Sequence, residues 1–241
     1  MLKPNTQYLI PQKAMYKLIH KNQNFIVIDK QQGVDFHLSG KNEGLCKIIR
    51  DKEKLTDLFP VHRLDKITSG LLLFARNKDT ARELSELFQN RQVEKFYIGL
   101  SDKKPKKRQG MITGDMEKSR RGAWKLLRSK TNPAKTRFFS KVCGNGLRLY
   151  ILKPLTGKTH QLRVALKSIG APVLGDPLYN KAESKNHDRC YLHAYALRFP
   201  FHGERLSFLT LPDEGKNFRD KEFLESIEEY AEPWCLNWPV K

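Results

Sequence analysis

The sequence predicts an α+β fold with a mainly antiparallel mixed β-sheet and flanking helices and loops. Short extended segments dominate the chain, and helical segments lie among them without the regular alternation that a parallel sheet requires. A chain of 241 residues can bury a sizeable core without disulfides or metal ions. We expect an irregular arm over residues 1–21 and one compact domain over 22–241, with a basic insert at about 101–137 and a C-terminal helix and tail at about 216–241.

The strands are predicted from short apolar runs that turn residues separate. Residues 25–28 (Phe-Ile-Val-Ile) open the domain, and residues 70–76 form the densest apolar segment of the chain. A strand pair is expected where residues 144–146 (Gly-Asn-Gly) join two extended runs. The further strands are expected at 93–100, 137–142, 147–152 and 206–211.

Other segments have helical periodicity. Residues 80–83 (Thr-Ala-Arg-Glu) match a capping box, which predicts a helix that starts there and runs to about residue 90. Residues 159–169 place an apolar stripe on one helix face and Arg163 on the opposite face, and Gly170 follows at the expected stop. A closing helix is expected at 220–231.

The charge of the chain indicates a polyanionic partner. The 45 Lys and Arg residues exceed the 26 Asp and Glu residues by far more than solubility requires, which gives a formal net charge of +19. In the basic insert, cations could bind phosphates while Trp124 stacks on a base, although a solvated loop explains the same charges equally well. The insert residues expected to contact this polyanion are Lys103, Lys104, Lys106, Lys107, Arg108, Arg120 and Arg121.

Several other classes of protein are disfavoured. Cys46, Cys143, Cys190 and Cys235 lie far apart, without a Cys-x-x-Cys pair or histidines at zinc-ligand spacing, so we expect reduced thiols and no metal. The longest apolar run, residues 71–75, is too short to cross a membrane, and no export signal is visible. No dinucleotide fingerprint or phosphate loop is present. We therefore expect a cytoplasmic monomer without metal or organic cofactor.

The most specific segment covers residues 62–73 (His-Arg-Leu-Asp-Lys-Ile-Thr-Ser-Gly-Leu-Leu-Leu), just before and within the apolar strand. A carboxylate on a turn at a strand edge can face a cleft while its backbone stays rigid, and Asp65 fits this description. From the residues alone, however, Asp65 beside Arg63 and Lys66 is better explained as an ordinary surface ion pair.

This segment closely resembles the His-Arg-Leu-Asp-x-x-Thr-Ser-Gly-Leu-Leu signature of the RluA family of RNA pseudouridine synthases. Further segments are similar to family segments in the same order, and several short motifs in register rarely arise by chance. They are 93–97 (Val-Glu-Lys-Phe-Tyr), 157–163 (Gly-Lys-Thr-His-Gln-Leu-Arg), 170–179 (Gly-Ala-Pro-Val-Leu-Gly-Asp-Pro-Leu-Tyr) and 192–194 (Leu-His-Ala). The resemblance implies that residues 22–241 form a pseudouridine synthase catalytic domain.

The resemblance also implies roles for single residues. Asp65 is expected to be the catalytic carboxylate, Tyr97 the active-site tyrosine, and Arg163 the guanidinium that keeps Asp65 ionised and oriented. The target uridine must be extruded from structured rRNA or tRNA, such as a stem-loop, and Arg63 would support that extruded state. Lys158 replaces the family's usual arginine and loses a bidentate fork.

Other polar residues are expected to bind RNA or to support the site. Lys158 and His160 are expected RNA contacts. His62 and His160 are expected to orient their loops by hydrogen bonds, and Asp176 to cap backbone amides in its turn. We expect no N-terminal S4 domain of the kind that is frequent in the family, so the catalytic domain and the basic insert would have to bind the RNA.

Two alternative functions remain open. A catalytically silent RNA-binding or ribosome-assembly factor would use the same basic surface, but retention of Asp65, Tyr97 and Arg163 together argues against it. A hydrolase of glycosidic bonds normally needs two carboxylates that flank the bond. The matched segments contain no second acidic residue that must serve as this partner.

Overall fold

The computed structural model describes residues 14–35 and 44–240. In these ranges, the main sheet has ten strands and a main path of β1-β2-β4-β11-β5-β10-β9-β6. Its strands are β1 (Tyr16–Lys21), β2 (Phe25–Lys30), β3 (Phe59–Pro60), β4 (Ser69–Ala75), β5 (Glu94–Ser101), β6 (Gln109–Gly114), β9 (Ala134–Val142), β10 (Arg148–Pro154), β11 (Leu192–Phe201) and β12 (Glu204–Leu209).

Helices and a small hairpin complete the fold. The helices are α1 (Leu45–Lys52), α2 (Lys78–Gln89), α3 (Gln161–Ser168), α4 (Lys181–Ser184) and α5 (Lys221–Glu228). The hairpin pairs β7 (Met116–Lys118) with β8 (Trp124–Leu126). Among the described strands, every pairing is antiparallel except that of β11 with β4. The predicted α+β class with a mainly antiparallel sheet is therefore confirmed.

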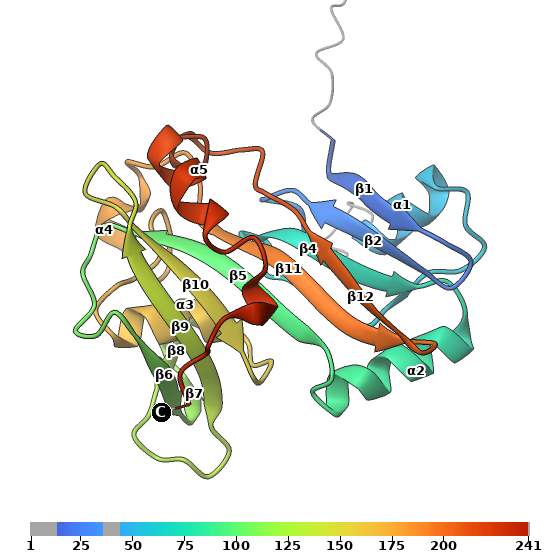
Figure 1. The fold of residues 1–241 in the computed structure, drawn as a ribbon, viewed down its shortest axis with the longest axis horizontal. Helices are drawn as coiled ribbons and strands as arrows, with labels where there is room; N and C mark the ends of the chain where they lie inside the picture. Colours follow the sequence, from blue (N-terminus) through green and yellow to red (C-terminus); the bar gives the residue numbers. More distant parts are fainter. Residues whose placement is uncertain (1–13, 36–43, 241) are drawn as a thin grey trace, which may run out of the picture.

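The sheet separates two cores in the half that contains β5, β10 and β9. Successive side chains of a strand point to opposite faces, so Ile151 of β10 packs with Phe223 of α5, whereas Leu152 packs with Leu166 of α3. Helices α3 and α5 consequently cover opposite faces of this half (Figure 1). The face under α3 carries the site described below.

The predicted irregular arm over residues 1–21 is wrong in its second part. Residues Tyr16–Lys21 form β1 and pair with β2. The alternation of buried and exposed residues is weak in this edge strand, because only Tyr16 is fully buried and the register shifts between Leu18 and His20. Residues 1–13 lie outside the described ranges.

The basic insert at 101–137 is likewise more ordered than a loop. Its residues include β6, which pairs with β9 at the edge of the sheet, and the β7–β8 hairpin. Charged residues and glycines hide the strand pattern here, since β6 buries Gly110, Ile112 and Gly114 and leaves the residues between them partly exposed.

Several other boundaries differ from the predicted ones. Helix α2 begins at Lys78, two residues before the predicted start. Its N-cap is Asn77 and not Thr80, because the side chain of Asn77 accepts a hydrogen bond from the backbone N of Thr80 at 2.8 Å. Helix α1 and the long strand β11 were not predicted. The strands expected at 25–28, 70–76, 93–100, 137–142, 147–152 and 206–211 correspond to β2, β4, β5, β9, β10 and β12.

The described residues contain neither a membrane-spanning helix nor a metal-binding cluster. None of the helices is long and apolar enough to cross a membrane. Within the same ranges, no group of three or more His, Cys, Asp or Glu side chains is arranged to hold a metal ion.

Candidate active site

Asp65 lies in the loop that enters β4, and backbone contacts fix this loop. The backbone N of Thr68 donates to the carbonyl of Asp65 at 3.0 Å. The carbonyl of Lys66 accepts from the backbone N of Gly33 at 2.8 Å and from the buried ammonium of Lys30 at 3.3 Å. The Asp65 side chain itself remains 22% exposed, so a rigid loop presents the carboxylate to an open space.

The start of β4 is fixed by a buried polar network. The hydroxyl of Ser69 bonds to Nδ1 of His193 at 2.8 Å and accepts from Nη2 of Arg189 at 2.5 Å. Gly70 has a φ of +112°, and a Cβ at this position would collide with the backbone of Ala194 on β11. Glycine is therefore required where β4 and β11 approach most closely. The hydroxyl of Ser69 thus anchors the turn at the start of β4.

Arg163, near the start of α3, connects two carboxylates. Its Nη1 donates to Oδ2 of Asp65 at 3.0 Å, while Nε and Nη2 donate to the two oxygens of Asp176 at 2.7 and 3.0 Å. Burial disfavours a charged guanidinium, but the hydrogen bonds and charge of Asp176, followed by those of Asp65, raise the pKa of Arg163 above its ordinary value. Arg163 is therefore a fixed cation beside Asp65, and not a residue of an exposed helix face.

Asp176 has two structural functions. Besides the pair with Arg163, its Oδ1 accepts from the backbone N of Leu178 at 2.8 Å and of Tyr179 at 3.1 Å. The predicted capping role is thus confirmed, whereas the ion pair with Arg163 was not predicted. Asp176 has no exposed surface, so it orients Arg163 from behind.

The loop before α3 is held by Gln161. Its Oε1 accepts from the hydroxyl of Thr156 at 2.7 Å and from the backbone N of Lys158 at 3.0 Å. His160 follows this loop in the left-handed region, with a φ of 56°, and its Nδ1 bonds to the hydroxyl of Tyr179 at 3.0 Å. Its Nε2 lies 3.9 Å from Oδ2 of Asp65. Burial and the charge of Arg163 lower the pKa of His160, which favours the neutral ring.

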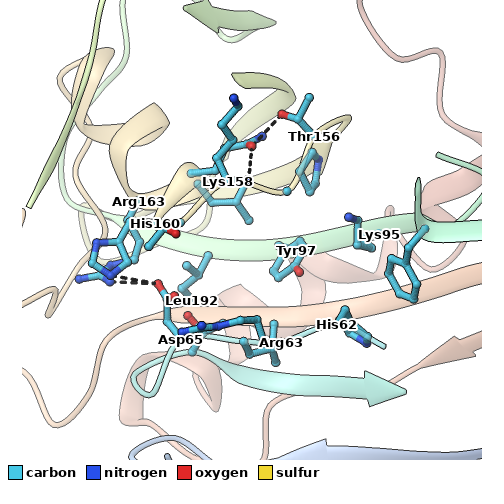
Figure 2. A pocket seen from close by; sticks show the side chains of 18 of the residues that line it. His62, Arg63, Asp65, Lys95, Tyr97, Thr156, Lys158, His160, Arg163 and Leu192 are labelled. Atoms are coloured by element: carbon cyan, nitrogen blue, oxygen red, sulfur yellow. Dashed lines mark hydrogen bonds and ion pairs between the residues drawn. The ribbon is translucent and has the colours of Figure 1, made fainter. Parts of the chain in front are cut away.

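Tyr97 of β5 forms the floor of the site. Figure 2 shows its ring between the Asp65–Arg163 pair and Lys95. Burial and the charge of Asp65 raise the pKa of Tyr97 above its ordinary value, so the hydroxyl stays protonated at neutral pH.

His62 supports the site from the other end of the Asp65 loop. Its Nε2 accepts from the backbone N of Leu73 at 3.0 Å, and its ring stacks on Phe88 with the centroids 4.8 Å apart. Burial and the charge of Lys95 lower the pKa of His62 to about 3. His62 is therefore a neutral residue that orients its loop.

These groups surround one pocket of about 440 Å³. Its volume is in the range of small-molecule sites. Of the predicted site residues, Asp65, Tyr97, Arg163, Arg63, Lys158 and His160 line this pocket. Lys95, which the sequence analysis did not select, lines it as well.

The cations of the basic insert lie elsewhere. None of the seven predicted insert residues lines the pocket. Lys103 is exposed and pairs with Asp102 at 2.8 Å. Arg120 and Arg121 are exposed in the turn between β7 and β8. That hairpin contacts the site indirectly, because the backbone N of Trp124 donates to the hydroxyl of Tyr179 at 2.9 Å.

Comparisons with known proteins identify the family of this chain. Residues 24–168 match the family described as RNA pseudouridylate synthase. The chain is 46% identical over 214 residues to an "Uncharacterized RNA pseudouridine synthase" of Haemophilus influenzae, a match that covers 89% of this chain and 95% of that one. It is 33% identical to the "Dual-specificity RNA pseudouridine synthase RluA" of Pasteurella multocida, with 85% and 97% covered.

A solved structure is similar over most of its length. The human RNA Pseudouridylate Synthase Domain Containing 1 superposes with a TM-score of 0.69 at 28% identity, over 82% of this chain and 83% of that one. Fold, pocket and relatives together define the class of enzyme as isomerases that convert uridine in RNA to pseudouridine. The chain belongs to the RNA pseudouridylate synthase family, among its RluA-type members, which confirms the resemblance found in the sequence.

Proposed function

We propose that this enzyme isomerises a specific uridine in structured RNA by means of the Asp65 carboxylate. The observation that carries the proposal is the contact of Asp65 with Arg163, 3.0 Å apart at the wall of a pocket large enough for a nucleotide. A fixed guanidinium attracts this partly buried carboxylate and holds its orientation by a charge-assisted hydrogen bond. In the described part of the chain, Oδ1 of Asp65 has no hydrogen-bond partner, so this oxygen is available to the substrate.

The reaction breaks the bond between N1 of uracil and C1′ of the ribose and forms a bond between C5 and C1′. The proton on C5 is lost and N1 gains one, so no atom is gained or lost overall. Asp65 faces the ribose and uracil and assists the breaking of the glycosidic bond. Tyr97 lies under the uracil ring, and its protonated hydroxyl assists proton transfer. The walls of the pocket hold the detached uracil beside C1′ until C5 faces it.

Arg63 is suited to stabilise the extruded state of the RNA. It is exposed at the edge of the pocket, and it forms no hydrogen bond or ion pair with another described residue. An unpaired guanidinium beside the pocket can bind the backbone or occupy the space that the uridine leaves. Lys158 and His160 contribute to RNA binding from the opposite wall (Figure 2).

The basic insert is proposed to hold the RNA outside the pocket. The β7–β8 hairpin is joined through Tyr179 to His160, so Arg120 and Arg121 extend from a support that contacts the active site. Lys103, Lys104, Lys106, Lys107 and Arg108 are exposed and are proposed to contact more distant phosphates. An rRNA or tRNA stem-loop as the substrate, a monomeric state and a cytoplasmic location are parts of the same proposal.

The substrate can be identified by mapping pseudouridine across the RNA of cells with and without this protein. The proposal predicts at least one site that is lost on deletion, restored by the wild-type protein and not restored by Asp65→Ala. Equal restoration by both proteins would reject a catalytic role for Asp65. A map unchanged by deletion would instead favour a silent RNA-binding factor.

A further inference from the structure

A second depression adjoins the Asp65 pocket. It measures about 480 Å³, and we call it the side groove. The residues that line this groove alone are Arg91, Val93, Glu94, Arg137, Lys153 and Leu155. Phe88, Gln89, Lys95, Pro154, Thr156 and Gly157 line the Asp65 pocket as well. The two spaces are therefore continuous, and Lys95 stands where they meet.

Lys95 is a cation without a counterion in the described part of the chain. Its neighbour Glu94 points to the other side of β5, where it accepts from the ammonium of Lys153 at 2.6 Å. The Lys95 ammonium lies 5.5 Å from the ring centroid of Phe88. Burial lowers the pKa of Lys95. An ammonium that is desolvated but unpaired is costly, and an anionic ligand would remove this cost.

One arginine extends the positive charge along the side groove. Arg91 has a φ of 58° in the exposed turn after α2, and it pairs with no carboxylate among the described residues. Arg137 lines the groove as well, but it lies opposite Lys153 in the register of β9 and β10 and therefore points to the other face of the sheet. Lys153 on that face is neutralised by Glu94. The side groove therefore offers the guanidinium of Arg91 beyond Lys95, on the side away from Asp65.

We propose that the side groove holds the ribose-phosphate backbone of the nucleotide next to the target uridine, and that Lys95 binds the phosphate between the two. The inference rests on the proposed function, because it takes the Asp65 pocket as the place of the uridine. Lys95 and Tyr97 point to the same face of β5, about 6.6 Å apart along the strand. A uracil over Tyr97 would thus leave Lys95 beside its backbone.

The side groove is suited to bind RNA by its positive charge and not by stacking of a base. One face of Phe88 is already occupied by the ring of His62, at a centroid distance of 4.8 Å. Lys95 and Arg91 are suited to phosphate oxygens. We therefore expect the side groove to bind the backbone without preference for the base that follows.

The test measures the affinity of the purified protein for a fluorescent single-stranded oligouridylate at several salt concentrations. For single strands, log K falls with log salt by about 0.7 for each phosphate contact. We expect Lys95→Gln to weaken binding and to reduce this slope by about 0.7, and Lys95→Arg to retain the slope. Lys221→Gln is the matched control, because Lys221 is 85% exposed on α5, away from both pockets.

The slope of log K against log salt distinguishes a lost phosphate contact from a loss of stability. A lost contact releases fewer counterions on binding and lowers the slope, whereas a loss of stability leaves the slope of the folded protein unchanged. Thermal unfolding of each variant checks that it is folded. Should Lys95→Gln fail to fold, Arg91→Gln in the exposed turn is expected to reduce the slope in the same way. Slopes equal to wild type in folded Lys95→Gln, or in Arg91→Gln where that variant replaces it, would overturn the proposal. Binding needs no turnover, so a failure of Asp65 as the catalytic group would leave this readout intact.

Discussion

Arg163 joins Asp65 to Asp176: one edge of its guanidinium contacts the pocket carboxylate at 3.0 Å, and the other bonds both oxygens of a fully buried carboxylate. Two of the three side-chain hydrogen bonds that hold Arg163 therefore go to Asp176. Asp176 is the main support of the guanidinium that orients Asp65.

Asp176→Asn tests this dependence. The amide keeps the shape but loses the charge that holds Arg163, so we expect the free energy of unfolding to fall by about 3 to 5 kcal/mol. A displaced guanidinium should also lower kcat by about 10²-fold. Urea unfolding and single-turnover assays measure the two effects. Asp79→Asn, at a carboxylate that is 90% exposed on α2, is the control and should change neither. A normal kcat in folded Asp176→Asn would show that Arg163 needs no support.

Tyr97→Phe separates the ring of Tyr97 from its hydroxyl. The phenylalanine ring retains the packing in the pocket, so stability and RNA affinity should be preserved. Loss of proton transfer should lower kcat by about 10²-fold or more. Because the pKa of Tyr97 is raised, wild-type kcat should show no loss from ionisation of this hydroxyl up to about pH 9. Full kcat in Tyr97→Phe would contradict proton transfer by the hydroxyl and leave the ring as the only part of Tyr97 that catalysis needs.

His62 should remain neutral throughout the physiological range. Its pKa is lowered to about 3, so the imidazole should not titrate between pH 5 and 8. Imidazole resonances followed by NMR provide the measurement, and His62→Gln assigns the signal. A midpoint near the ordinary value of about 6.5 would contradict the burial and the hydrogen bond to Leu73 described above.

Lys30 should make stability depend on pH. Burial lowers its pKa from 10.5 to about 7, so between these values the unfolded chain binds a proton that the folded protein does not. The free energy of unfolding should therefore rise with pH above 7, by at most about 1.4 kcal/mol per unit from this group. The difference between wild type and Lys30→Met in urea unfolding at pH 7, 8 and 9 isolates the effect. If the difference in unfolding free energy does not change with pH, the carbonyls of Gln31, Val34 and Lys66 keep the Lys30 ammonium charged.

The sequence predicted the centre of the site better than its surroundings. Motifs in register identified Asp65, Tyr97 and Arg163, and the structure brings them to one pocket although they lie far apart in the chain. Lys95 was not selected, because a lysine within a strand pattern normally faces solvent. The structure shows that the neighbouring Glu94 pairs with Lys153 and therefore does not serve as the counterion of Lys95.

The fold was predicted where apolar runs are dense. Strands β2, β4, β5 and β10 were found because each buries most of its residues. Strands β1 and β6 lie at the two ends of the main path of the sheet, where a strand pairs on one side only and tolerates polar residues. The connection of Asp176 to Arg163 depends on how a turn packs against α3, and local sequence patterns carry no such information.

The most direct measurement compares pseudouridine formation by purified wild-type protein and Asp65→Asn, with RNA from cells that lack the protein as the substrate and mass spectrometry of the digested nucleosides as the readout. We expect the wild-type protein to form pseudouridine, and folded Asp65→Asn to bind the RNA without forming any. Equal amounts of pseudouridine from both proteins would contradict catalysis by Asp65.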